Sequence, residues 1–185
     1  MTRRDVSKQR KSTTRDLAVC AMLSALGVVL LYLGSFVEIM DMAMAAIASF
    51  AVIITVIEYG KGAPWAVYGV TSILSLILLP QKTPAAFYAL FFGFYPIIKE
   101  KIERKSKILR WVIKEIVFNI CFALMALVTI FFFTPAGSEL ETPLLIAVTV
   151  VLGEVAFILY DIALTRMISF YIFRLRDRLR INKNK

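Results

Sequence analysis

The sequence contains no histidine, and this absence narrows the chemistry that is open to the chain. Histidine is the commonest general base near neutral pH and the commonest metal ligand in proteins, so a protease of the HExxH type is excluded. Cysteine is almost as scarce, because Cys20 and Cys121 are the only two and both stand in apolar runs. Such cysteines are more typical of packing thiols than of a disulfide. We therefore expect neither a metal site nor a bound cofactor.

Charge is missing from several long stretches of the chain. Of the 185 residues, 59% are hydrophobic and the mean hydropathy is +0.77, whereas a soluble domain keeps its apolar content near ~45–50%. The stretch 17–34 carries no charged residue and is close to the ~20 residues that a helix needs to cross ~30 Å of hydrocarbon. The apolar runs are continuous and lack the alternation of barrel strands. The sequence therefore predicts an all-α membrane protein.

Short polar segments divide the apolar sequence into six predicted transmembrane helices. Proline is tolerated in a first helical turn, so Pro64 is expected near a helix start, and Thr83 is expected to cap a helix that begins at Pro84. Pro96 is expected to kink the fourth span. A re-entrant hairpin built from the third and fourth spans is the alternative. The sequence predicts one transmembrane domain, residues 17–173, between basic tails 1–16 and 174–185. Its six predicted spans are 17–35, 42–58, 64–79, 85–98, 111–133 and 144–168.

The distribution of positive charge predicts the orientation of these spans. The net charge is +9, and Lys and Arg gather on the cytoplasmic side of membrane proteins. With six spans and both termini inside, every Lys and Arg except Lys82 falls on or near the inner side. We therefore expect a multi-pass protein of the cell membrane with both termini in the cytoplasm. Since the positive residues flank apolar spans and no recognition motif accompanies them, anionic lipids are expected partners and nucleic acid is not.

Three polar side chains are predicted to lie within the membrane. Glu154 lies about 15 Å into the sixth span, near the midplane; Asp161 follows on the same face, and Asn119 is at a similar depth. Because ionisable groups are costly there, these residues are candidates for substrate binding, and Glu154 would suit a cationic or amine-bearing ring. The alternative is that they hydrogen-bond one another between helices. Lys114 and Glu115 are expected to extend to the inner interface.

An enzymatic role is not expected for these carboxylates. Glu154 and Asp161 are two helical turns apart, about 10 Å, which is long for a cooperating acid pair. The fourth span adds candidates of another kind, because it is rich in aromatic residues that stack planar ligands. Tyr88 and Phe91 are included as possible substrate-binding residues, although lipid-facing and interfacial aromatic residues are also common in membrane proteins.

The first span resembles a known family. Residues 15–26, RDLAVCAMLSAL, contain Ala21 and Ala25 at four-residue spacing, and they resemble the start of the substrate-binding S components of energy-coupling factor (ECF) vitamin transporters. Those proteins are small, have six helices with both termini inside, and carry an AxxxA motif on their first helix. Residues 62–72, GAPWAVYGVTS, are similar to the small-residue-rich third helix of the same proteins.

This resemblance implies that one subunit binds the substrate and other subunits drive its release. The S component captures a vitamin-like small molecule in an outer-half pocket, and a transmembrane T subunit with two cytoplasmic ATPases releases it inside. Ala21 and Ala25 would contact the T subunit. ATP would bind the partner ATPases, which agrees with the lack of a GxxxxGK[ST] loop here, and the absence of histidine argues against nickel and cobalt as substrates. The alternative function is a membrane scaffold protein like the small cell-shape proteins of bacteria.

Overall fold

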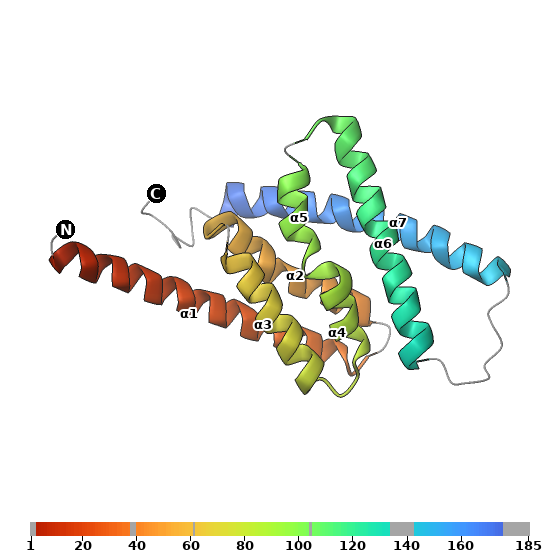
Figure 1. Ribbon diagram of the computed structural model, residues 1–185, viewed down its shortest axis with the longest axis horizontal. Helices are drawn as coiled ribbons and strands as arrows, with labels where there is room; N and C mark the ends of the chain where they lie inside the picture. The colour runs from red at the N-terminus through yellow and green to blue at the C-terminus, as the bar shows by residue number, and fades with distance from the viewer. Residues whose placement is uncertain (1–2, 38–39, 61, 104, 134–142, 176–185) are drawn as a thin grey trace. The chain divides into compact units, whose positions relative to one another are not determined.

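The computed structural model describes residues 3–37, 40–60, 62–103, 105–133 and 143–175 (Figure 1). Every regular element in these ranges is a helix, which confirms the all-α class. The chain divides into two compact units, Met1–Arg104 and Lys105–Lys185.

The first unit, called unit 1 below, holds a long first helix followed by shorter ones. Its elements are α1 (Arg3–Gly34), α2 (Asp41–Glu58), α3 (Ala63–Leu78), α4 (Thr83–Phe87), the π-helical segment η2 (Tyr88–Phe92) and α5 (Tyr95–Ile102). The second unit, unit 2, is a pair of long helices with a short extension. Its elements are α6 (Lys107–Phe133), α7 (Pro143–Phe170) and the π-helical segment η3 (Tyr171–Leu175).

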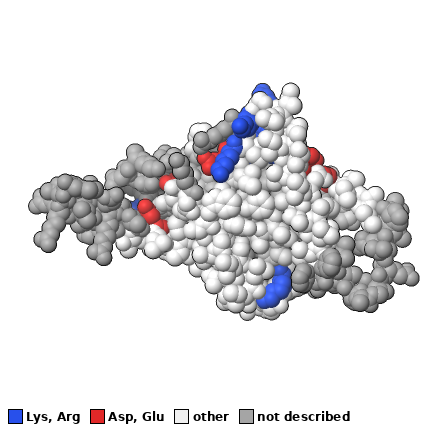
Figure 2. All heavy atoms as spheres, viewed as in Figure 1, with Lys and Arg blue, Asp and Glu red and all other residues white. Residues whose placement is uncertain are grey.

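Four helices are long and apolar enough to cross a membrane. The helix α3 is also apolar but shorter, and the predicted fourth span is divided among α4, η2 and α5. On the face drawn in Figure 2, uncharged atoms cover most of the described surface. These findings agree with a multi-pass membrane protein, whereas the six-span topology stays a prediction. The four candidate spans are Thr14–Gly34, Asp41–Glu58, Lys107–Val128 and Ile146–Arg174.

The predicted helix boundaries hold for most spans, and two of them differ. The limits of α2, α3, α6 and α7 agree with the sequence predictions to within about one helical turn. The first helix begins at Arg3 instead of Leu17, so the backbone of the basic segment continues the helix. The predicted cap at Thr83 is wrong, because Lys82 already has helical dihedral angles and makes Thr83 the first helical residue. The Lys82 ammonium instead donates to the carbonyl of Leu79, 2.6 Å away, at the end of α3.

The helix α2 lies at the centre of unit 1. It contacts α1, α3, α4, η2 and α5, and Figure 1 shows α1, α2 and α3 side by side. Its buried face is built largely from small side chains, which let helix backbones approach closely where lipid removes the hydrophobic drive for association. The buried small residues on this helix are Ala45, Ala48, Ser49 and Ala51.

The predicted fourth span is broken near its middle. The backbone N–H of Gly93 donates to the carbonyl of Tyr88, 2.7 Å away, so the helix widens to the π form over Tyr88–Phe92. A turn at Gly93 and Phe94 follows, and α5 starts with Pro96 in its first turn. The predicted kink therefore takes the form of a break just before Pro96. Short π segments within helices are frequent at functional sites.

Gly93 lets two tyrosine rings approach the backbone at this break. A Cβ atom added to Gly93 would lie 2.5 Å from Cδ2 of Tyr68 and 2.9 Å from Cε1 of Tyr88. Both contacts are closer than real Cβ atoms make, and neither ring has a flexible end that turns aside. The packing of α3 against η2 therefore requires a residue without a side chain at this position.

We expect Gly93→Ala to lower the free energy of unfolding by about 1–3 kcal/mol, because the methyl group overpacks the two rings. Gly69→Ala is the matched control, since Gly69 also lies in a helix but has no atom within 4 Å of an added Cβ. That control is expected to be neutral or to stabilise by about 0.5–1 kcal/mol through helix propensity. Unfolding of the micelle-embedded protein in an SDS titration, followed by circular dichroism, measures both. Equal effects would contradict the packing argument.

Candidate functional site

In unit 2, the helices α6 and α7 meet along a seam of matched side chains. The Lys114 ammonium lies 2.7 Å from Oδ2 of Asp161. One turn further along α6 and one turn back along α7, the rings of Phe118 and Phe157 stack with their centroids 4.4 Å apart. The steps are of four residues on both helices and run in opposite chain directions, so the two contacts lie on one face of each helix.

The Lys114–Asp161 pair corrects the prediction for Lys114. This lysine was expected to extend to the inner interface, but 8% of its side chain is exposed and its ammonium faces Asp161, whose side chain is 16% exposed. A charge in an apolar seam is costly unless a counter-charge is close, so the interhelical contact is favoured over extension along the helix. Sequence reasoning had placed Asp161 within the membrane but had not matched it with this partner.

Asn119 and Glu154 form a second interhelical contact in the same seam. The amide of Asn119 donates to Oε1 of Glu154 at 3.0 Å and to the carbonyl of Glu115 at 3.1 Å. The other Glu154 oxygen, Oε2, is buried and has no hydrogen-bond partner among the described residues. Glu154 therefore combines an interhelical contact with one unused acceptor.

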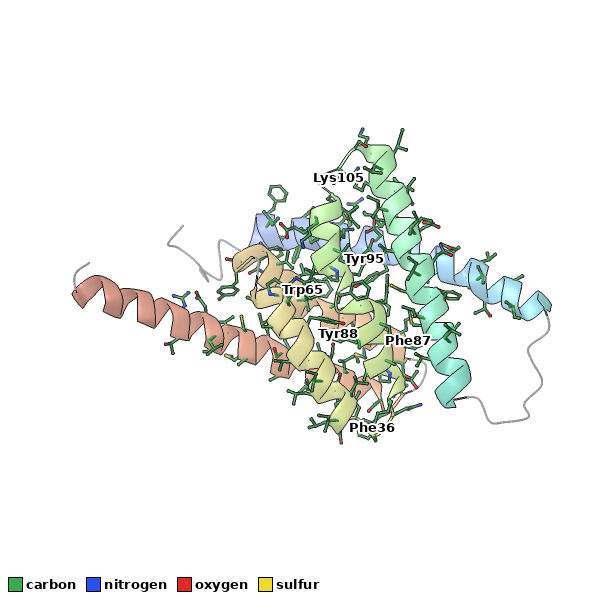
Figure 3. The ribbon with its side chains drawn as sticks, viewed as in Figure 1. Phe36, Trp65, Phe87, Tyr88, Tyr95 and Lys105 are labelled. Atoms are coloured by element: carbon green, nitrogen blue, oxygen red, sulfur yellow. The ribbon has the colours of Figure 1, made fainter. Side chains whose placement is uncertain are left out.

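In unit 1, the aromatic candidates Tyr88 and Phe91 are both buried. The Phe91 ring packs against Tyr95 with centroids 5.0 Å apart, and the Tyr88 ring lies 6.3 Å from Tyr68. The Tyr68 hydroxyl donates to the carbonyl of Ala89 at 2.8 Å, which ties α3 to the π segment. Neither Tyr88 nor Phe91 faces lipid, so the lipid-facing alternative does not hold for them. Figure 3 shows Tyr88 and Tyr95 on the broken helix and Trp65 on α3.

Three buried hydroxyl groups of unit 1 were not predicted from the sequence. The hydroxyls of Thr71, Ser72 and Tyr88 are buried and have no hydrogen-bond partner among the described residues. A single sequence gives no signal for this, because serine and threonine in membrane helices usually bond to their own backbone.

The five predicted substrate-binding residues thus fall into two groups. Tyr88 and Phe91 belong to unit 1, and the remaining three belong to the seam of unit 2. Within each set, the predicted residues pack against or bond to other side chains of the same unit. The seam residues are Asn119, Glu154 and Asp161.

The helix α1 presents different residues on its two faces. Ser24, Gly27 and Leu31 are buried, and a Cβ added to Gly27 would lie 3.0 Å from Cγ2 of Thr71 on α3. Ala21 and Ala25 are both exposed. The packing of α1 inside unit 1 therefore uses Ser24 and Gly27 and leaves the Ala21–Ala25 face uncovered.

No protein-family model, no curated protein and no solved structure matches this chain.

We expect Lys114→Met to lower the free energy of unfolding of the hairpin by about 3 kcal/mol, because it leaves the Asp161 carboxylate without its counter-charge. The double variant Lys114→Met with Asp161→Leu removes both charges and is expected to recover most of that loss. A double-mutant cycle by SDS titration in micelles measures the coupling. If the double variant is less stable than Lys114→Met, the seam does not depend on this ion pair.

Proposed function

We propose that this chain is the substrate-capturing membrane subunit of an ECF-type importer for a vitamin-like small molecule. The observation that carries the proposal is the exposure of Ala21 and Ala25 on α1. A small-xxx-small face allows close approach of another helix in a membrane, and unit 1 does not use this face for its own packing. The resemblance of residues 15–26 and 62–72 to S components supports the same function.

The proposed topology has six spans with both termini in the cytoplasm of a bacterial cell. Four helices have the length and apolar character of full spans, and we assign α3 and the broken helix α4–η2–α5 as the third and fourth. The orientation follows from the positive charges, since Lys82 is the one Lys or Arg that this topology places outside. On this topology, Ala21 and Ala25 lie in the inner half of the first span.

In this proposal the chain has no catalytic role. A T subunit docks on the Ala21–Ala25 face and connects the chain to two cytoplasmic ATPases, which bind the ATP. Two separate groups of residues are candidates for binding the substrate: the buried aromatic residues Tyr88 and Phe91 of unit 1, and the polar residues of the α6–α7 seam in unit 2. The seam residues assigned to the substrate are Glu154, Asn119 and Asp161.

A second candidate function is a membrane scaffold protein of the bacterial cell-shape type. One observation favours it, since the polar side chains of the α6–α7 seam bond to one another and interhelical bonds of this kind stabilise a bundle without any ligand. Purification from native membranes distinguishes the two functions. Recovery of ATPase subunits supports the importer, and recovery of cell-wall assembly proteins without ATPases supports the scaffold.

We expect Ala21→Trp and Ala25→Trp each to reduce co-purification of the T subunit and ATPases at least tenfold. The bulky ring prevents the close helix approach that alanine allows, as overpacking does at other tight contacts. Co-purification is measured by quantitative mass spectrometry of the complex isolated through a tag on this chain.

Ala66→Trp is the control for this experiment, because Ala66 is an exposed alanine on a different helix, α3. It is expected to leave the recovery of partners unchanged. If Ala21→Trp and Ala25→Trp still assemble like the wild-type chain, this face is not the docking surface.

We expect Glu154→Gln to reduce substrate uptake by cells at least fivefold, because the carboxylate has one unused, buried acceptor oxygen that an amide replaces with a poorer or a donor group. Glu100→Gln, an exposed position on α5, is the control and is expected to leave uptake unchanged. Uptake of the radiolabelled small molecule released from the purified complex measures the effect. Unchanged uptake in Glu154→Gln would assign Glu154 to helix packing alone.

A further inference from the structure

The helix α1 continues well beyond its candidate membrane span. It runs without a break from Arg3 to Gly34 (Figure 1), whereas the span begins at Thr14. The backbone from Arg3 to Thr14 is about 16 Å long at ~1.5 Å per residue. A lipid headgroup layer is only about 5–8 Å thick, so the N-terminal part of α1 passes through it, even with a helix tilt of about 20°. On the proposed topology this part of α1 enters the cytoplasm.

The basic residues of this extension occupy positions on one side of the helix. Four of them are spaced by four, three and four residues, which places them in one row along the helix. Two more, spaced by seven residues, form a second row next to the first. At about 100° per residue, the two rows together cover just under half of the helix circumference. The rows are Arg4, Lys8, Lys11 and Arg15, and Arg3 with Arg10; they are called the basic face below.

The acidic residues of the same segment occupy the opposite side. Asp5, Asp16 and Gly27 are spaced by eleven residues, which is about three helical turns, so the three positions lie on one side of α1. A Cβ added to Gly27 would lie 3.0 Å from Cγ2 of Thr71 on α3. This is therefore the side on which α1 packs within unit 1, and the basic face is directed away from it.

The basic face is continuous with the exposed alanine residues of the span. Its first row continues from Arg15 to Ala18 and Ala25, at spacings of three and seven residues, and Ala21 stands eleven residues after Arg10. All three alanines and Arg15 are exposed. One side of α1 is thus small and apolar within the membrane and basic beyond it.

A role in membrane orientation alone does not account for this arrangement. Positive charge keeps a tail in the cytoplasm through its amount, whichever side of a helix carries it. Anionic lipids attract the positions nearest the span. However, Arg3 and Arg4 lie about 15 Å from its start, about a Debye length beyond the headgroups. A second copy of this chain is a poor partner, because its cytoplasmic side is basic on the proposed topology and like charges repel.

We propose that the basic face and the Ala21–Ala25 face bind one membrane partner, whose docking helix continues into an acidic cytoplasmic segment. The inference rests on the proposed function, in which this partner is the T subunit. Alanine lets the partner helix approach closely within the membrane. Beyond the membrane the basic face meets carboxylates, and this complementarity of charge selects the partner and speeds association.

A rearrangement of charge tests the basic face at constant net charge. In the rotated variant, Lys8→Gln with Gln9→Lys and Lys11→Ser with Ser12→Lys, two charges move about 100° around the helix and leave the basic face. We expect at least fivefold less T subunit and ATPase to co-purify with it, measured by quantitative mass spectrometry. The control, Lys8→Arg with Lys11→Arg, is expected to leave recovery unchanged. If the rotated variant recovers as much as the wild-type chain, the amount of charge suffices and the proposal is wrong.

Photo-cross-linking in native membranes identifies what the basic face contacts. Ser7 is four residues before Lys11 and shares its side of the helix, whereas Gln9 is four residues after Asp5 and lies on the opposite side. We expect p-benzoylphenylalanine at position 7 to cross-link an acidic peptide of the partner, and at position 9 to do so at least fivefold less. Cross-links from position 7 that form with lipid, with a segment lacking net negative charge, or with nothing overturn the proposal.

An NMR measurement tests the extension of α1 without any partner. The full-length chain is placed in nanodiscs whose lipids include a gadolinium-chelating headgroup, which broadens the signals of nearby amides. We expect the amide of Lys11 to be broadened at least twofold more than that of Arg4, which lies about 10 Å further along the helix. Equal broadening means that the extension lies on the lipid surface, which contradicts the proposal.

These experiments fail separately from the proposed function. If ATPases co-purify equally with the wild-type chain and the rotated variant, the importer function stands and the basic face is not a docking surface. If cell-wall assembly proteins co-purify instead, and both Ala25→Trp and the rotated variant lose them, the docking surface stands and the importer function is wrong.

Discussion

The structure depends on one constraint, which is that polar groups on apolar helices must find partners within the protein. Backbone groups are satisfied by the helices themselves, so the constraint falls on side chains. In unit 2 it determines how α6 meets α7, because Lys114 faces Asp161 and Asn119 faces Glu154 across the seam. Apolar packing between these contacts, such as the stacked rings of Phe118 and Phe157, follows the same register. The polar pairs therefore align the helices, and the aromatic residues fill the contact between them.

The same constraint explains which parts of the fold were predictable. Helix limits in membrane proteins are marked locally by charge, proline and turn residues, and the predicted limits of α2, α3, α6 and α7 agree with the structure. The predicted cap at Thr83 was wrong because Lys82, one residue earlier, already has helical dihedral angles. Thr83 is therefore the first residue of the helix instead of its cap. The first helix begins at Arg3 because a helix does not have to end where its apolar face does. Local signals thus predict where helices lie and are less accurate at their ends.

The candidate sites were less predictable because their contacts are long-range. Asp161 and Glu154 were identified from depth alone, but their partners Lys114 and Asn119 lie 47 and 35 residues earlier in the chain. No periodicity within one helix indicates such a pairing. The hydroxyl of Thr71 is a harder case, since the usual expectation for a threonine in an apolar helix is a bond to its own backbone. Only the positions of α3 and η2 together reveal that Thr71 and Tyr88 are left without one.

The contrast between the units bears on the nature of the substrate. Glu154 at mid-depth suggests a cationic ring, and its two oxygens differ, because Oε1 accepts from Asn119 whereas Oε2 has no hydrogen-bond partner among the described residues. The hydroxyls of Thr71 and Tyr88 are buried and have no hydrogen-bond partner among the described residues. The helix α2, which contacts both α3 and η2, carries the buried carboxyl groups of Asp41 and Glu58. Where polar groups are already paired they build the fold, and where they are buried and unpaired they are better suited to recognise a ligand.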